Sequence, residues 1–179
     1  MSLRTWLQNR PRLLEAMYGF TRRLFLRAGP LIRRIGYERA DRWLRPFEEP
    51  AKRLVFDCRM CGQCILHATG MTCPMTCPKN LRNGPCGGVR MNGHCEVIPE
   101  MRCVWVEAFE RSERMATYGP EIMLIQPPVD RRLQGDSAWI NMLSGTDIVC
   151  PPGWELAREQ NRAEHLIPPL DLAGADHGY

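Results

Sequence analysis

The chain has a cluster of cysteines whose number and spacing suit metal binding. The first three form a C-x₂-C-x₂-C run, and a later cysteine directly precedes Pro78, a combination used to ligate iron–sulfur clusters. Spacing by two residues turns the chain tightly and brings three thiolates to one concave surface. We predict as metal ligands the eight cysteines between residues 58 and 103, which are Cys58, Cys61, Cys64, Cys73, Cys77, Cys86, Cys95 and Cys103.

Eight thiolates are the number that two [4Fe–4S] clusters require, and two such clusters are the preferred prediction. One cluster plus one zinc ion, or two Cys₄ zinc sites, would use the same eight ligands. The triple run favours iron–sulfur, because structural zinc sites usually combine two separate C-x₂-C pairs. A disulfide-bonded structure is the least favoured alternative. The spacing does not divide the cysteines between the two centres, since the fourth ligand of a run can bind the other cluster.

Three further residues of metal-binding type receive no ligand role. Cys150 stands alone, far beyond Cys103 in the sequence, and is expected to be a buried or idle thiol. His67 and His94 lie inside the cysteine region and are expected to be loop histidines.

The cysteine region contains too many prolines and glycines for long regular elements. We therefore predict a small α plus irregular, metal-stabilised fold, with loops around two metal centres. Helices are expected over residues 100–115 and, for one or two turns, over 137–143. The predicted organisation is a basic helical arm (1–53), a cysteine-rich metal-cluster domain (54–115), an extended segment packing on that domain or on a partner (116–150), and a polar tail (151–179).

The N-terminal arm carries 13 Lys and Arg residues against 5 Asp and Glu residues. An apolar residue recurs on one helical face at Leu13, Met17, Phe20 and Leu24. The pair Gly29-Pro30 is expected to end this helix, because proline lacks the amide that a helix interior needs. A second helix is predicted over residues 31–45. The apolar face is expected to pack on the cysteine domain or on a partner, with a membrane surface as the less favoured alternative.

No apolar run reaches the ~18 residues that a membrane-spanning helix needs. A stretch at residues 21–27 has a twin-arginine pattern, but the apolar region of an export signal does not follow it, so a cytoplasmic protein is expected. A (β/α)₈ barrel would need about 200 residues or more, so this chain of 179 residues is not expected to contain one. No dinucleotide-binding fingerprint or nucleophile–base pair is visible, so a non-catalytic protein is expected.

The sequence around the cysteines resembles a known family. The run beginning at Cys58, the segments Thr72–Asn80 and Asn83–Gly88, and Asn92–Val97 are similar to the cysteine-rich domain at the C terminus of certain methylenetetrahydrofolate reductases. Residues 127–141 are similar to the tail motif of that family. The resemblance covers roughly residues 55–145. In some bacteria this domain is a separate small subunit that accompanies a flavin-containing catalytic subunit.

The resemblance implies an iron–sulfur electron-transfer or accessory subunit of a flavin-dependent methylenetetrahydrofolate reductase in one-carbon metabolism. It implies a hetero-oligomer in which FMN is bound by the catalytic partner and which can include a further electron-transfer subunit. It carries the same eight cysteines over as ligands. The alternative function is a non-redox, zinc-binding subunit that scaffolds the reductase or another complex. A nucleic-acid binder is disfavoured, because the few basic residues of the cysteine region are balanced by acidic ones.

Overall fold

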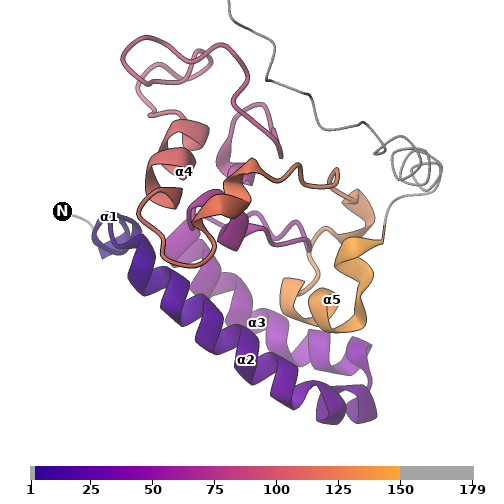
Figure 1. The fold of residues 1–179 in the computed structure, drawn as a ribbon. Helices are drawn as coiled ribbons and strands as arrows, with labels where there is room; N and C mark the ends of the chain where they lie inside the picture. Colours follow the sequence, from indigo (N-terminus) through magenta and orange to yellow (C-terminus); the bar gives the residue numbers. More distant parts are fainter. Residues whose placement is uncertain (1–2, 150–179) are drawn as a thin grey trace, which may run out of the picture. The chain divides into compact units, whose positions relative to one another are not determined.

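The computed structural model describes residues 3–149, which are helical at the N terminus and rich in loops around the cysteines (Figure 1). Five α-helices are formed in this part of the chain: α1 (Leu3–Gln8), α2 (Pro11–Ile35), α3 (Tyr37–Phe56), α4 (Val104–Ser112) and α5 (Ala138–Ser144). Short 3₁₀ turns complete it: η1 (Leu66–Thr69), η2 (Pro74–Thr76), η3 (Gly119–Met123), η4 (Arg131–Leu133) and η5 (Thr146–Ile148). Within residues 3–149 there is no β-strand, only an isolated bridge between His94 and Arg102.

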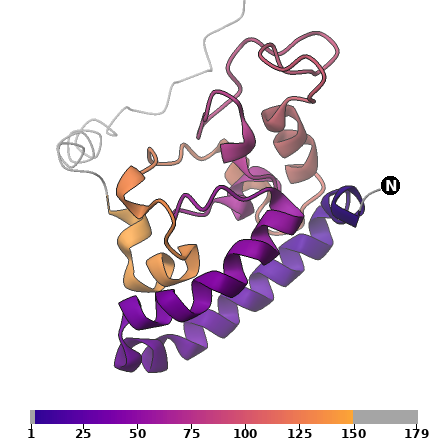
Figure 2. The same ribbon diagram turned by 180° about the vertical axis from the view of Figure 1, so that it is seen from behind.

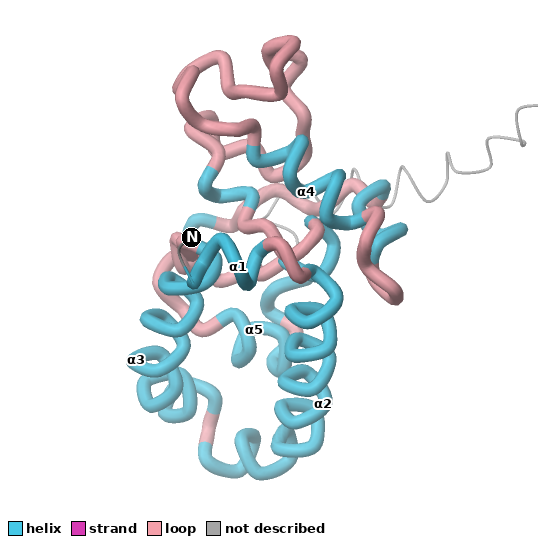
Figure 3. Tube along the Cα trace, turned by 90° about the vertical axis from the view of Figure 1, so that its left-hand side faces the viewer, coloured by secondary structure: helices cyan, strands magenta, loops and turns pink. Residues whose placement is uncertain are grey.

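Helices α2 and α3 run antiparallel and support the rest of the described chain (Figure 2). Seen from the side, α5 lies between them, and long loops lie at the end that carries α4 (Figure 3). The helical arm and the helix at α5 confirm the mostly helical part of the predicted fold class. No described helix is both long enough and apolar enough to cross a membrane.

The predicted break of the arm at Gly29-Pro30 is wrong. Helix α2 continues through Pro30 and ends before Gly36. Gly36 has a φ of 95°, a conformation that glycine adopts at little energetic cost. Helix α3 likewise continues through Pro46 and Pro50. All three prolines lie on exposed helix surface, where water can satisfy the carbonyl groups that lose a partner.

The apolar stripe of the arm is not buried in the described structure. Met17, Phe20 and Leu24 are all more than half exposed, whereas Leu14 is buried. The buried face of α2 is offset by about one residue from the predicted face. The apolar stripe therefore does not pack on the cysteine loops of this chain. Leu14 belongs to a cluster of buried residues whose other members are Leu66, Met71, Cys73, Met75 and Met115.

A buried carboxylate ties the arm to the segment that follows α4. Glu15 is buried and accepts three backbone N–H bonds, from Ala116 at 2.8 Å, Thr117 at 2.7 Å and Tyr118 at 2.8 Å. Burial raises the pKa of Glu15, but these three donors and the nearby Arg12 outweigh it, and the net pKa is lowered. The charged form of Glu15 is therefore part of the folded structure.

Replacing Glu15 with glutamine is expected to destabilise the protein by roughly 2–3 kcal/mol, since hydrogen bonds to a charged group are the strong ones. Urea unfolding at pH 7 measures the loss. The control is Glu49→Gln, which removes a carboxylate paired at the surface with Arg53 and is expected to cost less than about 0.5 kcal/mol.

The same contact predicts the direction of a pH effect. Because the folded pKa of Glu15 lies below its ordinary value, the stabilisation is complete above that ordinary value and disappears as the pH falls through the folded pKa. The difference in the free energy of unfolding between the wild type and Glu15→Gln should therefore shrink as the pH is lowered. A difference that stays constant down to pH 2.5 would contradict this assignment.

Candidate metal centres

The structure divides the eight predicted cysteines into two sets of four, in chain order. Each set lines its own small internal cavity. The first cavity is lined by Cys58, Cys61, Cys64 and Cys73, and the second is lined by Cys77, Cys86, Cys95 and Cys103. This division could not be derived from the spacing, and it is a result of the fold.

The first set is positioned by a sequence of tight turns at the end of α3. Asp57 (φ 52°), Met60 (φ 48°) and Gly62 (φ 76°) have left-handed backbone conformations, which reverse the chain between one cysteine and the next. The amide of Met60 donates to the sulfur of Cys58 at 3.3 Å. The fourth member, Cys73, precedes the turn η2.

The run is held from the other side by the segment before and within α5. The amide of Gly135 donates to the Met60 carbonyl at 2.8 Å, and Asn141 Nδ2 donates to the Gly62 carbonyl at 3.0 Å. Buried Gln63 accepts from the amide of Asp130 at 2.7 Å and donates to the carbonyl of Asp147 at 2.9 Å. The cysteine run is thus fixed by residues about 70–85 positions later in the chain.

The thiols of the first set lie close enough to affect one another. Burial, together with the charges of neighbouring thiolates, raises the pKa of Cys58 to about 11 and that of Cys73 to about 12. Four thiolates in one buried cavity repel each other unless a cation lies among them. The donor set therefore fits a metal centre, which would bind the thiolates and release their protons.

Buried basic residues accompany this first set. Lys52 lines the cavity from α3 and pairs with Glu48, whose other oxygen accepts from Ser137. Burial lowers the pKa of Lys52, but the charges of Cys64 and Glu48 outweigh it and the net pKa is raised. Arg82 reaches the same cavity from the loop beyond Cys77.

The second set is positioned by loops and by the start of α4. Cys103 is buried at the N-terminal end of this helix, and its amide donates to the Gly93 carbonyl at 2.9 Å. The amide of Cys95 donates to the Met101 carbonyl at 2.9 Å. Cys86 is exposed, and its sulfur lies 3.9 Å from the Glu96 carboxylate. Among the eight cysteines, Cys86 is the one that is exposed.

All eight cysteines are free thiols, with no disulfide among them. Among the described residues, no group of three or more Cys, His, Asp or Glu side chains is arranged to hold a metal ion. Each set of thiols lines one cavity. Cys150 lies outside the described residues.

The two histidines of the region take part in other contacts. Burial lowers the pKa of His67 to about 4, and its ring packs edge-on against Tyr18 at 5.3 Å between centroids. His94 Nδ1 lies 2.7 Å from the Pro99 carbonyl oxygen. Neither histidine lines a cysteine cavity in the described part of the chain.

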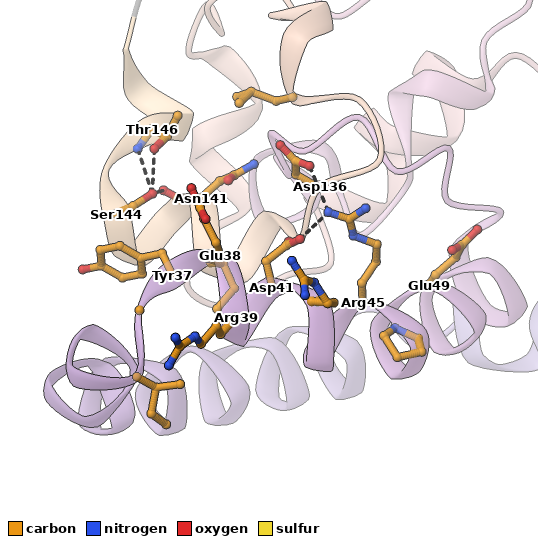
Figure 4. Close-up of a pocket in the computed structure, with 16 residues that line it drawn as sticks. Tyr37, Glu38, Arg39, Asp41, Arg45, Glu49, Asp136, Asn141, Ser144 and Thr146 are labelled. Atoms are coloured by element: carbon orange, nitrogen blue, oxygen red, sulfur yellow. Dashed lines mark hydrogen bonds and ion pairs between the residues drawn. The ribbon is translucent and has the colours of Figure 1, made fainter.

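A larger groove beside the turn between α2 and α3 contains no cysteine. Within it, Arg45 bridges Asp41 and Asp136 (Figure 4). The second carboxylate oxygen of Asp41 accepts from the amide of Ser137 at 2.7 Å. These contacts fasten α3 to the start of α5, which makes the groove a structural joint.

The polar residues around the first cavity were not predicted from the sequence; they are Gln63, Arg82 and the pair Glu48–Lys52. The pair has the i, i+4 spacing of a helical ion pair, which is a usable signal. Nothing in the sequence marks Gln63 or Arg82, because each acts through contacts with distant residues.

Comparison with known protein families identifies a match. A family model described as methylene-tetrahydrofolate reductase C terminal matches residues 37–132. The matched range begins with α3, contains all eight cysteines of the two cavities and ends within η4. No curated protein and no solved structure matches the chain. Since the match covers more than half of the chain, the protein belongs to the methylene-tetrahydrofolate reductase C-terminal family.

Proposed function

We propose that this protein is an iron–sulfur subunit that passes electrons within a flavin-dependent methylenetetrahydrofolate reductase complex. It would hold two [4Fe–4S] clusters, one in each cysteine cavity. Cys58, Cys61, Cys64 and Cys73 would ligate the first centre. Cys77, Cys86, Cys95 and Cys103 would ligate the second.

The observation that carries the proposal is the division of eight free thiols into two sets of four. Four thiolates are the full ligand set of one [4Fe–4S] cluster, and each set is complete within this chain. The C-x₂-C-x₂-C run that supplies Cys58, Cys61 and Cys64 favours iron–sulfur over zinc, because structural zinc sites usually combine two separate C-x₂-C pairs.

The residues of the chain would shape the surroundings of each centre. When bound, a [4Fe–4S] cluster accepts and donates single electrons. Met60, Leu66 and Met75 line the first cavity and are buried, so they would exclude water from it. Amides such as that of Met60, which donates to a ligand sulfur, favour the reduced state because they stabilise negative charge.

The catalytic partner would supply the flavin and the folate site. The membership in a reductase C-terminal family supports association with a methylenetetrahydrofolate reductase. The exposed apolar stripe of α2, formed by Leu13, Met17, Phe20 and Leu24, is available for a contact with such a partner.

The experiment is electron delivery to the flavoprotein. The protein is reduced with dithionite under anaerobic conditions, freed from the reductant by gel filtration, and mixed with the oxidised flavin-containing catalytic subunit. Loss of oxidised flavin absorbance is expected, up to one flavin per chain, because two one-electron centres supply the two electrons of a full flavin reduction. Buffer carried through the same reduction and filtration is the control.

A zinc-holding scaffold is the second candidate, because two sets of four thiols are also the donor set of two structural zinc sites. It predicts that the two proteins form a complex while the flavin absorbance stays unchanged. That result would contradict electron transfer by this chain.

A further inference from the structure

The two cavities have different electrostatic surroundings, and the difference lies in Arg82. Arg82 is buried, with 7% of its surface exposed, and lines the first cavity together with its four cysteines. Its Nη1 donates to the Gln63 carbonyl at 3.0 Å, while its buried Nε has no hydrogen-bond partner. The charge of Arg82 acts on the carboxylate of Asp147, but the two side chains form no ion pair in the described part of the chain.

The other charged side chains beside the first cavity have ion-pair partners. The ammonium group of Lys52 pairs with the carboxylate of Glu48, and Asp136 shares Arg45 with Asp41. Arg82 is therefore the buried positive charge at this cavity that has no ion-pair partner of its own among the described residues. Burial lowers the pKa of Arg82, and the charges of Cys61 and Cys64 act in the opposite direction, which places the guanidinium close to those sulfurs.

The second cavity has no such charge among its described lining residues. Lys79 and Glu96 line it and pair with each other, and both side chains are more than one third exposed. The Glu96 carboxylate lies 3.9 Å from the sulfur of Cys86, and its negative charge would repel an electron added to a centre bound there. Water screens both charges, so their effect on a bound centre is weaker than that of a buried group.

We propose that Arg82 makes the centre bound by Cys58, Cys61, Cys64 and Cys73 the higher-potential one of the pair. The inference rests on the proposed function. An extra electron adds negative charge to a centre, and a buried guanidinium stabilises that charge at low local dielectric. The unpartnered Nε also supplies a donor that can point to a cluster sulfur, and such hydrogen bonds contribute to reduction potential.

The consequence is a direction of electron transfer inside the chain. When the second centre is reduced and the first is oxidised, one electron passes from the second to the first. The second centre is thereby oxidised and the first is reduced, and no proton moves, because the guanidinium is charged before and after. The centre that includes the exposed Cys86 would receive electrons, and the centre beside the buried Arg82 would retain them.

The test is an anaerobic redox titration of the full-length protein, with dithionite as reductant and electron paramagnetic resonance as the readout. The wild type should show two reduction waves. In Arg82→Gln the higher-potential wave should move down. At the ambient potential where that centre is half reduced in the wild type, the ratio of reduced to oxidised centre should fall about tenfold, which is about 59 mV for a one-electron couple.

Two further variants separate charge from packing. Arg82→Lys keeps the charge and should return most of the shift. Arg59→Gln removes an exposed arginine between Cys58 and Cys61 and should leave both waves within about a twofold change in the same ratio, because solvent screens it.

Movement of the lower-potential wave, or of neither wave, in Arg82→Gln would overturn the inference while the clusters remain established. An Arg82→Lys variant that shifts as far as Arg82→Gln would also overturn it, since the charge would then have no role. Iron and sulfide are measured in every sample. Their absence from the wild type would contradict the proposed function itself, which is a different outcome.

Discussion

Replacing Cys61 with serine is expected to remove the first metal centre and to leave the second in place. Cys61 lines only the first of the two cysteine cavities, so its loss should leave three thiolates there and four in the other. Iron should fall from about eight to about four atoms per chain, with acid-labile sulfide falling in parallel. Anaerobic purification followed by metal and sulfide analysis measures both quantities.

The mirror-image variant makes this prediction specific. Cys95→Ser removes a member of the second set and should also halve the iron, while the double variant should remove nearly all of it. The signals that remain in the two single variants should add up to the wild-type spectrum. Loss of all iron from either single variant, with the protein still folded by circular dichroism, would show that the two sets are not independent centres.

Replacing Gly62 with alanine should lower the free energy of unfolding strongly, because there is no room for a methyl group at this point of the cysteine run. Gly62 has a φ of 76°, and a Cβ added to it would lie 2.7 Å from Leu133 Cβ and closer still to the Leu133 carbonyl oxygen. Backbone atoms cannot move away cheaply at a point where Asn141 also holds the Gly62 carbonyl. The expected cost is roughly 3–5 kcal/mol, measured by urea unfolding.

Gly87→Ala is the matched control, because Gly87 has the same φ of 76° and no atom within 4 Å of an added Cβ. It should cost only the conformational strain, about 1–2 kcal/mol. The Gly62 variant should also bind less metal at the first centre. Equal losses of stability in the two variants would mean that the contact between Gly62 and Leu133 does not constrain the run.

The sequence was most informative where the chemistry is local. The C-x₂-C-x₂-C run, the Cys-Pro pair and the total of eight thiols could be interpreted without a structure, because ligand type and spacing are properties of the chain itself. The division into two sets could not. It depends on Cys73 returning to the first three cysteines while Cys77, only four residues later, turns to the other cavity.

The helical arm shows why the packing was harder to predict. Its periodicity correctly indicates amphipathic helices, but the face that is buried carries Glu15 and not Phe20. A carboxylate can be buried there because three amides from residues 116–118 reach it. Those amides belong to a segment about 100 residues away, and no local pattern reports such a contact. The same holds for Arg82, whose importance arises from what surrounds it.

The most direct measurement of the central claim is the inorganic content of the protein purified without oxygen. Two [4Fe–4S] centres predict about eight iron atoms and about eight acid-labile sulfides per chain, with little zinc and a brown colour. A colourless protein that contains about two zinc atoms and no sulfide would contradict the account.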